Sequence, residues 1–115
     1  KGAITRFKIL TSFYFNDKPL ASLVNCWLET GRTHQIRVHM DAINHGIVGD
    51  QIYQSGKKSN LDLDGLLGEG YISFRRQALH AEKLSFQHPV SKTNLEFKCS
   101  PPKDFQELLA VFRNL

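Results

Sequence analysis

The stretch TGRTHQIRVHM, residues 30–40, decides how this chain is organised. It holds two arginines, two histidines, two threonines and a glutamine, and it follows an apolar run with a strand pattern. Gly31 is expected to end that strand. Thr33 is expected to cap a helix beginning at His34, because a threonine hydroxyl can accept from the free amides of a first helical turn. Folding alone does not require such polar density, so the stretch is the leading candidate for a functional site.

The residues before this stretch predict a pair of antiparallel strands. Apolar and polar side chains alternate over much of residues 4–15 and 20–29, which is typical of strands. The sequence Asn-Asp-Lys-Pro at residues 16–19 is a turn signal between the two runs. A short turn of this kind favours direct antiparallel pairing of the strands on either side.

The residues directly after the stretch predict the end of the helix and a loop. Apolar side chains continue at helical spacing as far as Ile43, and Gly46 is expected to supply the left-handed stop. Residues 55–70 are polar and rich in glycine, which predicts a surface loop with at most one weak turn over residues 61–67. Loops of this length are either tolerated insertions or functional lids, and we favour an insertion.

The last third of the chain predicts a second hairpin and a closing helix. Residues 79–88 and 95–99 have strand patterns, and residues 89–94 are expected to connect them. The final helix is indicated by apolar side chains spaced as on one helical face: Phe105, Leu108, Leu109 and Phe112. The order of elements predicts an α+β fold over residues 1–115, with a mixed, mainly antiparallel sheet and flanking helices.

Composition narrows the classes of function. The formal net charge is +4 and the isoelectric point is about 9.2, which permits an anionic partner such as RNA without requiring one. The two cysteines, Cys26 and Cys99, are far apart, so neither a disulfide framework nor a zinc site is expected, and a reducing cytoplasm fits them. No apolar run reaches the roughly 20 residues of a membrane span, so no membrane association is expected.

Spacing alone leaves the roles of the candidate residues open. A guanidinium one turn inside a helix, as Arg37 would be, can bind a carboxylate with two hydrogen bonds, or it can form a surface pair with Asp41 four residues on. Arg32 and His34 could bind phosphate at the start of the helix, or they could lie in a solvated loop. His34 and His39 are five residues apart and so face different sides of a helix, which argues against a metal site.

Three longer motifs carry a resemblance to a known family. They are ETGRTHQIRVHM at residues 29–40 with HGIVGD at 45–50 and Tyr53; RQALHA at 76–81 with HPV at 88–90; and PKDFQELL at 102–109. Together they resemble the RluA family of RNA pseudouridine synthases over nearly the whole chain. The second and third motifs are most similar to the branch that modifies the large ribosomal subunit.

The resemblance implies isomerisation of uridine to pseudouridine in RNA, without a cofactor or a metal, and the similarity to this branch implies that the RNA is rRNA. In that family an aspartate acts on a flipped-out nucleotide, and an arginine in the position of Arg37 pairs with it. Arg32, Thr33, His34 and Gln35 would then line the RNA side.

The same resemblance predicts that this chain is incomplete as an active site. The family's motif with the catalytic aspartate, and the segment with its tyrosine, would both precede Lys1. The chain is therefore expected to be the C-terminal portion of a catalytic domain and to be inactive alone. The alternative is a non-catalytic RNA-binding remnant of a split or truncated synthase. The target uridine and the oligomeric state are not specified by the sequence.

Overall fold

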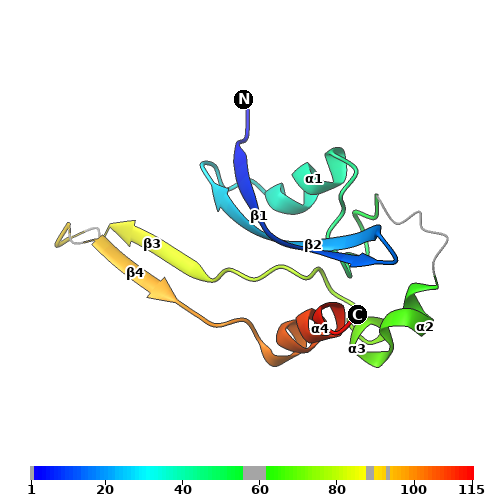
Figure 1. Cartoon of the computed structure of the whole chain (residues 1–115). Helices are drawn as coiled ribbons and strands as arrows, with labels where there is room; N and C mark the ends of the chain where they lie inside the picture. The colour runs from blue at the N-terminus through cyan, green and yellow to red at the C-terminus, as the bar shows by residue number, and fades with distance from the viewer. Residues whose placement is uncertain (1, 56–61, 88–89, 93) are drawn as a thin grey trace.

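Two antiparallel hairpins and four helices make up the described part of the chain, residues 2–55, 62–87, 90–92 and 94–115 of a computed structural model (Figure 1). In chain order the elements are β1 (Thr5–Phe15), β2 (Lys18–Leu28), α1 (Gln35–Ala42), α2 (Leu63–Leu67), α3 (Glu69–Ile72), β3 (Lys83–Gln87), β4 (Asn94–Lys98) and α4 (Lys103–Arg113). The predicted α+β class with antiparallel strands is confirmed. In the described residues the strands form two separate two-stranded sheets, not one larger sheet.

The β1–β2 hairpin confirms the predicted strand pair. Its turn consists of Asn16 and Asp17, both with positive φ (49° and 64°), as a tight two-residue turn between right-twisted strands requires. The register shifts after Ile9, which pairs with Val24, whereas Thr11 pairs with the adjacent Leu23. Neighbouring strand residues point to opposite faces of a hairpin. This bulge therefore changes which side chains of β1 lie on each face of the hairpin.

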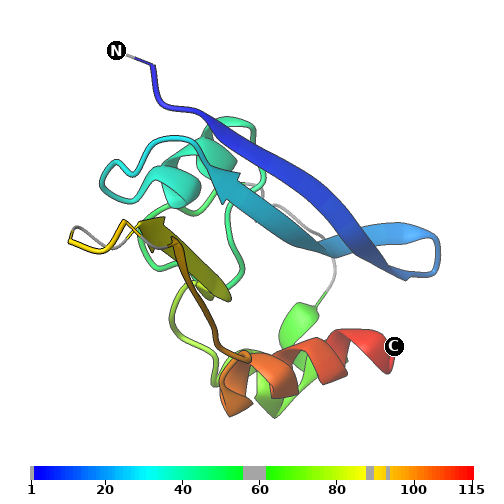
Figure 2. The same cartoon turned by 90° about the vertical axis from the view of Figure 1, so that its left-hand side faces the viewer.

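The apolar core lies between the turn end of this hairpin and the helices that follow it. Phe13 is 7% exposed, and its ring centroid is 5.5 Å from that of Phe112 on α4. Figures 1 and 2 show α4 and α3 side by side beneath the hairpin. The predicted closing helix is thereby confirmed. The buried members of the core are Phe13, Leu67, Phe74, Leu108 and Phe112.

The segment predicted as a surface loop contributes to this core. Residues 56–61 lie outside the described residues, but α2 and α3 occupy most of the remainder. The expected weak turn is present as α2, where Asp62 caps the helix by accepting from Gly65 N. Leu67 is only 7% exposed, so for this part of the segment the prediction of a surface loop is wrong.

Helix α1 ends differently from the prediction. The left-handed residue after it is Asn44, with φ 69°, and Gly46 is not in that region. Gly46 is instead where the chain passes close to residues 53–55: its N donates to Ser55 O at 3.2 Å, and an added Cβ would lie 2.7 Å from the same oxygen. A glycine is thus required here for a close backbone approach.

The β3–β4 hairpin is shorter than predicted and extends away from the core (Figure 1). Its register runs from Lys83 opposite Lys98 to Gln87 opposite Asn94, and residues 79–82 precede it without strand structure. Residues 88, 89 and 93 lie outside the described residues, so part of the predicted connection, and part of the HPV motif, is not described. The radius of gyration, 16.1 Å, exceeds the roughly 13 Å expected for a compact domain of this length, in keeping with a projecting hairpin.

Candidate active site around Arg37

The candidate stretch forms the corner between β2 and α1. Glu29 N donates to Ile4 O at 3.1 Å, so the two strands stay paired up to the corner. His34 then adopts a left-handed conformation, with φ 51°, immediately before the first helical residue, Gln35. The predicted cap is wrong, because His34 and not Thr33 occupies the capping position and no side chain bonds to the helix amides there.

Gln35 ties this corner to the start of β1. Its side chain is buried, with 4% of the residue exposed. Its Oε1 accepts from Thr30 Oγ1 (2.8 Å) and Arg32 N (3.1 Å), and its Nε2 donates to Ile4 O (3.0 Å) and Thr5 Oγ1 (2.9 Å). A glutamine amide has two donor hydrogens and one oxygen with two lone pairs, so its hydrogen-bonding capacity is filled. Gln35 thus has a structural role in the corner, and its contact with RNA stays a prediction.

Arg37 is the centre of the site, and its side chain is bound from within the chain. Its Nε donates to Asp50 Oδ2 at 2.8 Å and its Nη2 to Asp50 Oδ1 at 2.9 Å. Arg37 is 9% exposed and Asp50 has no exposed surface. The alternative surface pair with Asp41 is wrong, because the Asp41 carboxylate instead accepts from Ser55 N at 2.9 Å.

Asp50 is further stabilised as an anion by the backbone of the turn that follows it. Its Oδ1 also accepts from Ile52 N (2.9 Å) and Tyr53 N (3.0 Å). The hydrogen bonds from Arg37, and then those backbone amides, hold the pKa of the Asp50 carboxyl well below its ordinary value, although burial opposes this shift. The same pairing raises the pKa of Arg37. The pairing therefore favours the charged form of both groups.

The turn that carries Asp50 is fixed against the segment of the second motif. Ala78 N donates to Val48 O at 2.8 Å. Gly49 has φ 82°, and a Cβ there would collide with the carbonyl oxygen of Arg76. Only glycine meets both conditions without strain. The first and second sequence motifs thus meet at this turn, which places Asp50 rigidly beside α1.

One edge of the Arg37 guanidinium remains available. A guanidinium has five N–H donors, and Asp50 uses the edge formed by Nε and Nη2. On the other edge, Nη1 makes no hydrogen bond to any residue in the described ranges, and Nη2 uses one of its two hydrogens for Asp50. That edge has the spacing of a second carboxylate or a phosphate. Asp50 itself, having no exposed surface, is not placed to attack a bound nucleotide.

Tyr53 connects Arg37 to the exposed corner. The Arg37 Cζ lies 5.1 Å from the centroid of the Tyr53 ring, within the range of a cation–π contact. The His34 ring meets Tyr53 edge to face, with centroids 5.9 Å apart and planes at 79°, and His34 Nδ1 is 3.4 Å from the Tyr53 hydroxyl oxygen. A continuous series of contacts therefore runs from His34 through Tyr53 and Arg37 to Asp50.

The other predicted RNA-facing residues lie on the surface of the corner. Arg32, Thr33 and His34 are all exposed, in contrast to Gln35 and Arg37 directly after them. The structure thus divides the predicted set into three residues open to solvent and two that are buried. Exposed cationic and hydroxyl groups beside a buried arginine are compatible with an anionic ligand that enters from the corner.

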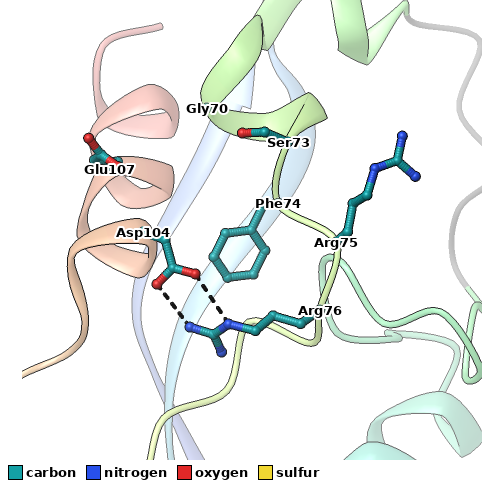
Figure 3. Close-up of a pocket in the computed structure, with 7 residues that line it drawn as sticks. All are labelled: Gly70, Ser73, Phe74, Arg75, Arg76, Asp104 and Glu107. Atoms are coloured by element: carbon teal, nitrogen blue, oxygen red, sulfur yellow. Dashed lines mark hydrogen bonds and ion pairs between the residues drawn. The ribbon is translucent and has the colours of Figure 1, made fainter.

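A surface depression among the described residues lies elsewhere. It has a volume of about 340 Å³ and is lined by Gly70, Ser73, Phe74, Arg75, Arg76, Asp104 and Glu107 (Figure 3). It contains an ion pair of the same form as the buried one, with Arg76 Nη2 2.9 Å from Asp104 Oδ1 and Nε 3.2 Å from Oδ2. None of the predicted site residues lines it.

A family of known proteins has a sequence similar to the part of the chain that contains this corner. Residues 1–42, which include the corner and Arg37, match the family model described as RNA pseudouridylate synthase. The resemblance to pseudouridine synthases, a family of isomerases, is therefore confirmed, and it rests on the part of the chain that forms β1, β2 and α1.

Individual relatives extend the similarity over nearly the whole chain. Proteins named ribosomal large subunit pseudouridine synthase D are 44% identical in Zymomonas mobilis, 43% in Buchnera aphidicola and 41% in Neisseria meningitidis. These alignments cover 96%, 95% and 98% of this chain, but 32%, 33% and 28% of the relatives. The chain thus spans about a third of the length of the curated relatives it matches.

Two further observations concern sites of other kinds. In the described residues, no helix has the length and apolar character needed to cross a bilayer. Within the same residues, no three histidine, cysteine, aspartate or glutamate side chains are grouped so that they could hold a metal ion.

Sequence reasoning missed the importance of Asp50 and Tyr53. Both belong to the motif that carries the family resemblance, but no role was predicted for either. The available signal was the sequence Gly49-Asp50 in a turn after an apolar run, where an aspartate commonly bonds to the backbone two or three residues on. That signal predicts a turn and does not predict an ion pair with a residue of the preceding helix.

Proposed function

We propose that this chain is the C-terminal part of the catalytic domain of an RNA pseudouridine synthase. In the complete enzyme, we propose, it takes part in converting uridine to pseudouridine in structured RNA of the large ribosomal subunit, in the cytoplasm. The observation that carries this proposal is the 37–44% identity, over at least 95% of the chain, to relatives that bear that name. The buried Arg37 at the corner supports it, because it provides the kind of group that the family's chemistry uses.

The proposed reaction breaks the bond between uracil N1 and ribose C1′ and forms a bond between C5 and C1′. The hydrogen on C5 is released to solvent and N1 takes up a proton, so the change is an isomerisation and requires no oxidant or cofactor. A base inside folded RNA is reached by flipping its nucleotide out of the stack. The family's aspartate, which we place in a segment outside this chain, would act on the flipped nucleotide.

Arg37 is proposed to hold that aspartate with its unused edge. A carboxylate in a base-binding pocket is costly to desolvate unless a cation and hydrogen bonds compensate it. The Nη1–Nη2 edge would pair with the aspartate while Asp50 retains the Nε–Nη2 edge. In this arrangement one arginine pairs bidentately with Asp50 within the chain and still serves a second carboxylate.

Arg32, Thr33 and His34 are proposed to contact the RNA backbone. All three are exposed at the corner that precedes Arg37. Cationic and hydroxyl side chains at such positions bind phosphates and ribose hydroxyls, which orients the RNA without reading its bases. The mild excess of positive charge in the chain is compatible with this role.

The β1–β2 hairpin supports the proposal that the chain is part of a larger domain. Several of its large apolar side chains are about half exposed, among them Phe7 (49%), Ile9 (54%) and Trp27 (52%). Phe7 and Ile9 lie on one face of the hairpin, and Trp27, which pairs with Arg6, lies on the other. Half-exposed apolar side chains on both faces of a hairpin are typical of surfaces that another element covers. The remaining two thirds of the relatives' length would provide that element.

The test uses the full natural polypeptide that contains this sequence. It is incubated with large-subunit rRNA carrying tritium at uridine C5, and tritium release and pseudouridine content are measured. We expect turnover by the wild type and none by the isolated 115-residue chain. Arg37→Lys keeps the charge but removes the bidentate edge, and it should lower turnover at least about 100-fold.

The outcomes separate the proposal from its alternative. Binding of the RNA without pseudouridine formation by the full polypeptide would favour a non-catalytic RNA-binding protein. Turnover by the isolated chain, or near-normal turnover by Arg37→Lys, would contradict the role assigned to Arg37 and the absent aspartate.

A further inference from the structure

We infer that Asp50 and Tyr53 are positioning residues that fix the orientation of the Arg37 guanidinium toward the proposed catalytic aspartate. The inference rests on the proposed function, which assigns Arg37 to the reaction. Neither residue is expected to touch the reacting nucleotide. Their effect on the reaction would pass through Arg37.

Arg37 needs external constraints to keep one orientation. An arginine side chain has several rotatable bonds, and an unconstrained guanidinium would sample many orientations. The two hydrogen bonds to Asp50, at 2.8 and 2.9 Å, fix both the position and the plane of the group. The Tyr53 ring, 5.1 Å from Cζ, covers the group and restricts rotation out of that plane. Together these contacts fix the direction of the Nη1–Nη2 edge, on which Nη1 has no partner among the described residues.

Asp50 is itself held in place by its surroundings. Its Oδ1 accepts from the amides of Ile52 and Tyr53, and the turn is fixed to residues 76–78 through Gly49 and Val48. An anchor must move less than the group it orients, and a fully buried carboxylate with four hydrogen bonds meets that condition. A simple charge partner on the surface would not require this construction.

Tyr53 also contacts the exposed corner. His34 packs edge to face on its ring, so an RNA strand bound at His34 would press on the same ring that covers Arg37. Positioning residues of this kind act on the rate of the chemical step, since small displacements of a catalytic group reduce the population of productive complexes.

The experiment compares Asp50→Asn with wild type in the full natural polypeptide. Rates are measured in single turnovers with saturating enzyme in excess over labelled RNA, because that rate constant does not depend on the fraction of enzyme that is folded. We expect the rate constant to fall about 100-fold, while the enzyme concentration that gives half the maximal rate changes less than about threefold. Asp104→Asn, which removes the carboxylate of the exposed Arg76 pair, is the matched control and should leave both values unchanged.

A double-variant comparison separates positioning from a general structural role. If Asp50 acts only through Arg37, then Asp50→Asn should have almost no additional effect in an Arg37→Lys background. Independent, multiplying effects on the rate constant would overturn the inference, as would an unchanged rate constant in Asp50→Asn alone.

Tyr53→Leu provides a second route if Asp50→Asn does not fold. It removes the ring over Arg37 and should lower the single-turnover rate constant about tenfold, again only when Arg37 is present. A wild-type rate constant in this variant would overturn the inference. Absence of any turnover in the wild-type polypeptide would instead overturn the proposed function together with this inference, so the two failures are distinguishable.

Discussion

The molecule contains two aspartate–arginine pairs of the same form in opposite surroundings. Arg37 and Asp50 are buried, with side-chain exposures of 11% and 0%, whereas Arg76 and Asp104 are 44% and 51% exposed. Both pairs are bidentate, and in both an aromatic ring lies near 5 Å from the guanidinium carbon, at 5.1 Å for Tyr53 and 5.0 Å for Phe74. The difference shows that the geometry of an ion pair does not by itself indicate its contribution to stability. The free energy lost when one partner is removed depends on how deeply the other partner is buried.

The largest effect is expected when Asp50 loses its partner. Arg37→Ala would leave the Asp50 carboxylate buried without a cation, and breaking such a pair from one side typically costs about 3–5 kcal/mol. Chemical denaturation of the full polypeptide should show a loss of this order in the free energy of unfolding. Arg37→Ala combined with Asp50→Asn should recover part of it, because the unpaired charge is then removed. A loss no greater than that of Arg76→Ala would show that the burial of the pair has little energetic consequence.

The second effect is a dependence of the unfolding free energy on pH. It should be marked for the buried pair and weak for the exposed pair. The pKa of Asp50 is lowered, first by the hydrogen bonds from Arg37, so its ionised form stabilises the fold fully above the ordinary aspartate pKa near 4. That contribution is lost as the pH falls below about 4. The difference in unfolding free energy between wild type and Asp50→Asn should therefore be constant from pH 7 to about 5 and shrink below pH 4.

The exposed pair provides the control for this measurement. The pKa of Asp104 is also lowered, first by the hydrogen bonds from Arg76, but solvent and salt screen this pair. Asp104→Asn should therefore change the acid profile much less, and any change should disappear in high salt. A stability difference for Asp50→Asn that did not depend on pH would mean that the ionised state of Asp50 is not what stabilises the buried pair.

How much of this could be read from the sequence depends on whether the deciding interactions are local. The β1–β2 hairpin, α1 and α4 follow from alternation, spacing and turn residues, all of which act over a few positions. The partner of Arg37 does not follow from such local patterns. Asp41 has the right spacing along the helix, but the structure uses it to bind Ser55 N, and Asp50 reaches Arg37 only because the chain folds back through the turn at Gly49.

The start of α1 shows the same limit. Thr33 fits the usual cap preference, yet His34, in a left-handed conformation that non-glycine residues seldom adopt, precedes the helix. The sequence predicts Gln35 as a polar residue facing RNA, whereas its burial depends on Ile4 and Thr5, about thirty residues earlier. Contacts at that separation are set by the packing of β1 beside the corner and leave no local pattern in the sequence.

An intermediate effect is expected at Gln35, which is buried but uncharged. Gln35→Ala would leave the amide of Arg32 without its partner and would remove one of the two hydrogen bonds to the carbonyl of Ile4, which still accepts from Glu29 N. A polar group that loses its partner away from water typically costs about 1–3 kcal/mol. Water can reach part of the corner, so the loss should be below that of Arg37→Ala. Hydrogen exchange of the Arg32 amide should accelerate in the variant. Unchanged exchange and stability would show that the corner is held by other contacts.

The smallest effect is expected at the exposed pair of Figure 3. Arg76→Ala removes a bidentate contact that solvent can replace, so the change in Tm should be well below that of Arg37→Ala. Some loss is still expected, because the Arg76 guanidinium lies over the ring of Phe74, a member of the apolar core. Arg76→Met keeps most of that nonpolar cover without the charge, and it should restore most of the lost stability. If Arg76→Met were as unstable as Arg76→Ala, the ion pair with Asp104 would be the main contribution, and the contrast between the buried and exposed pairs would be smaller than their burial indicates.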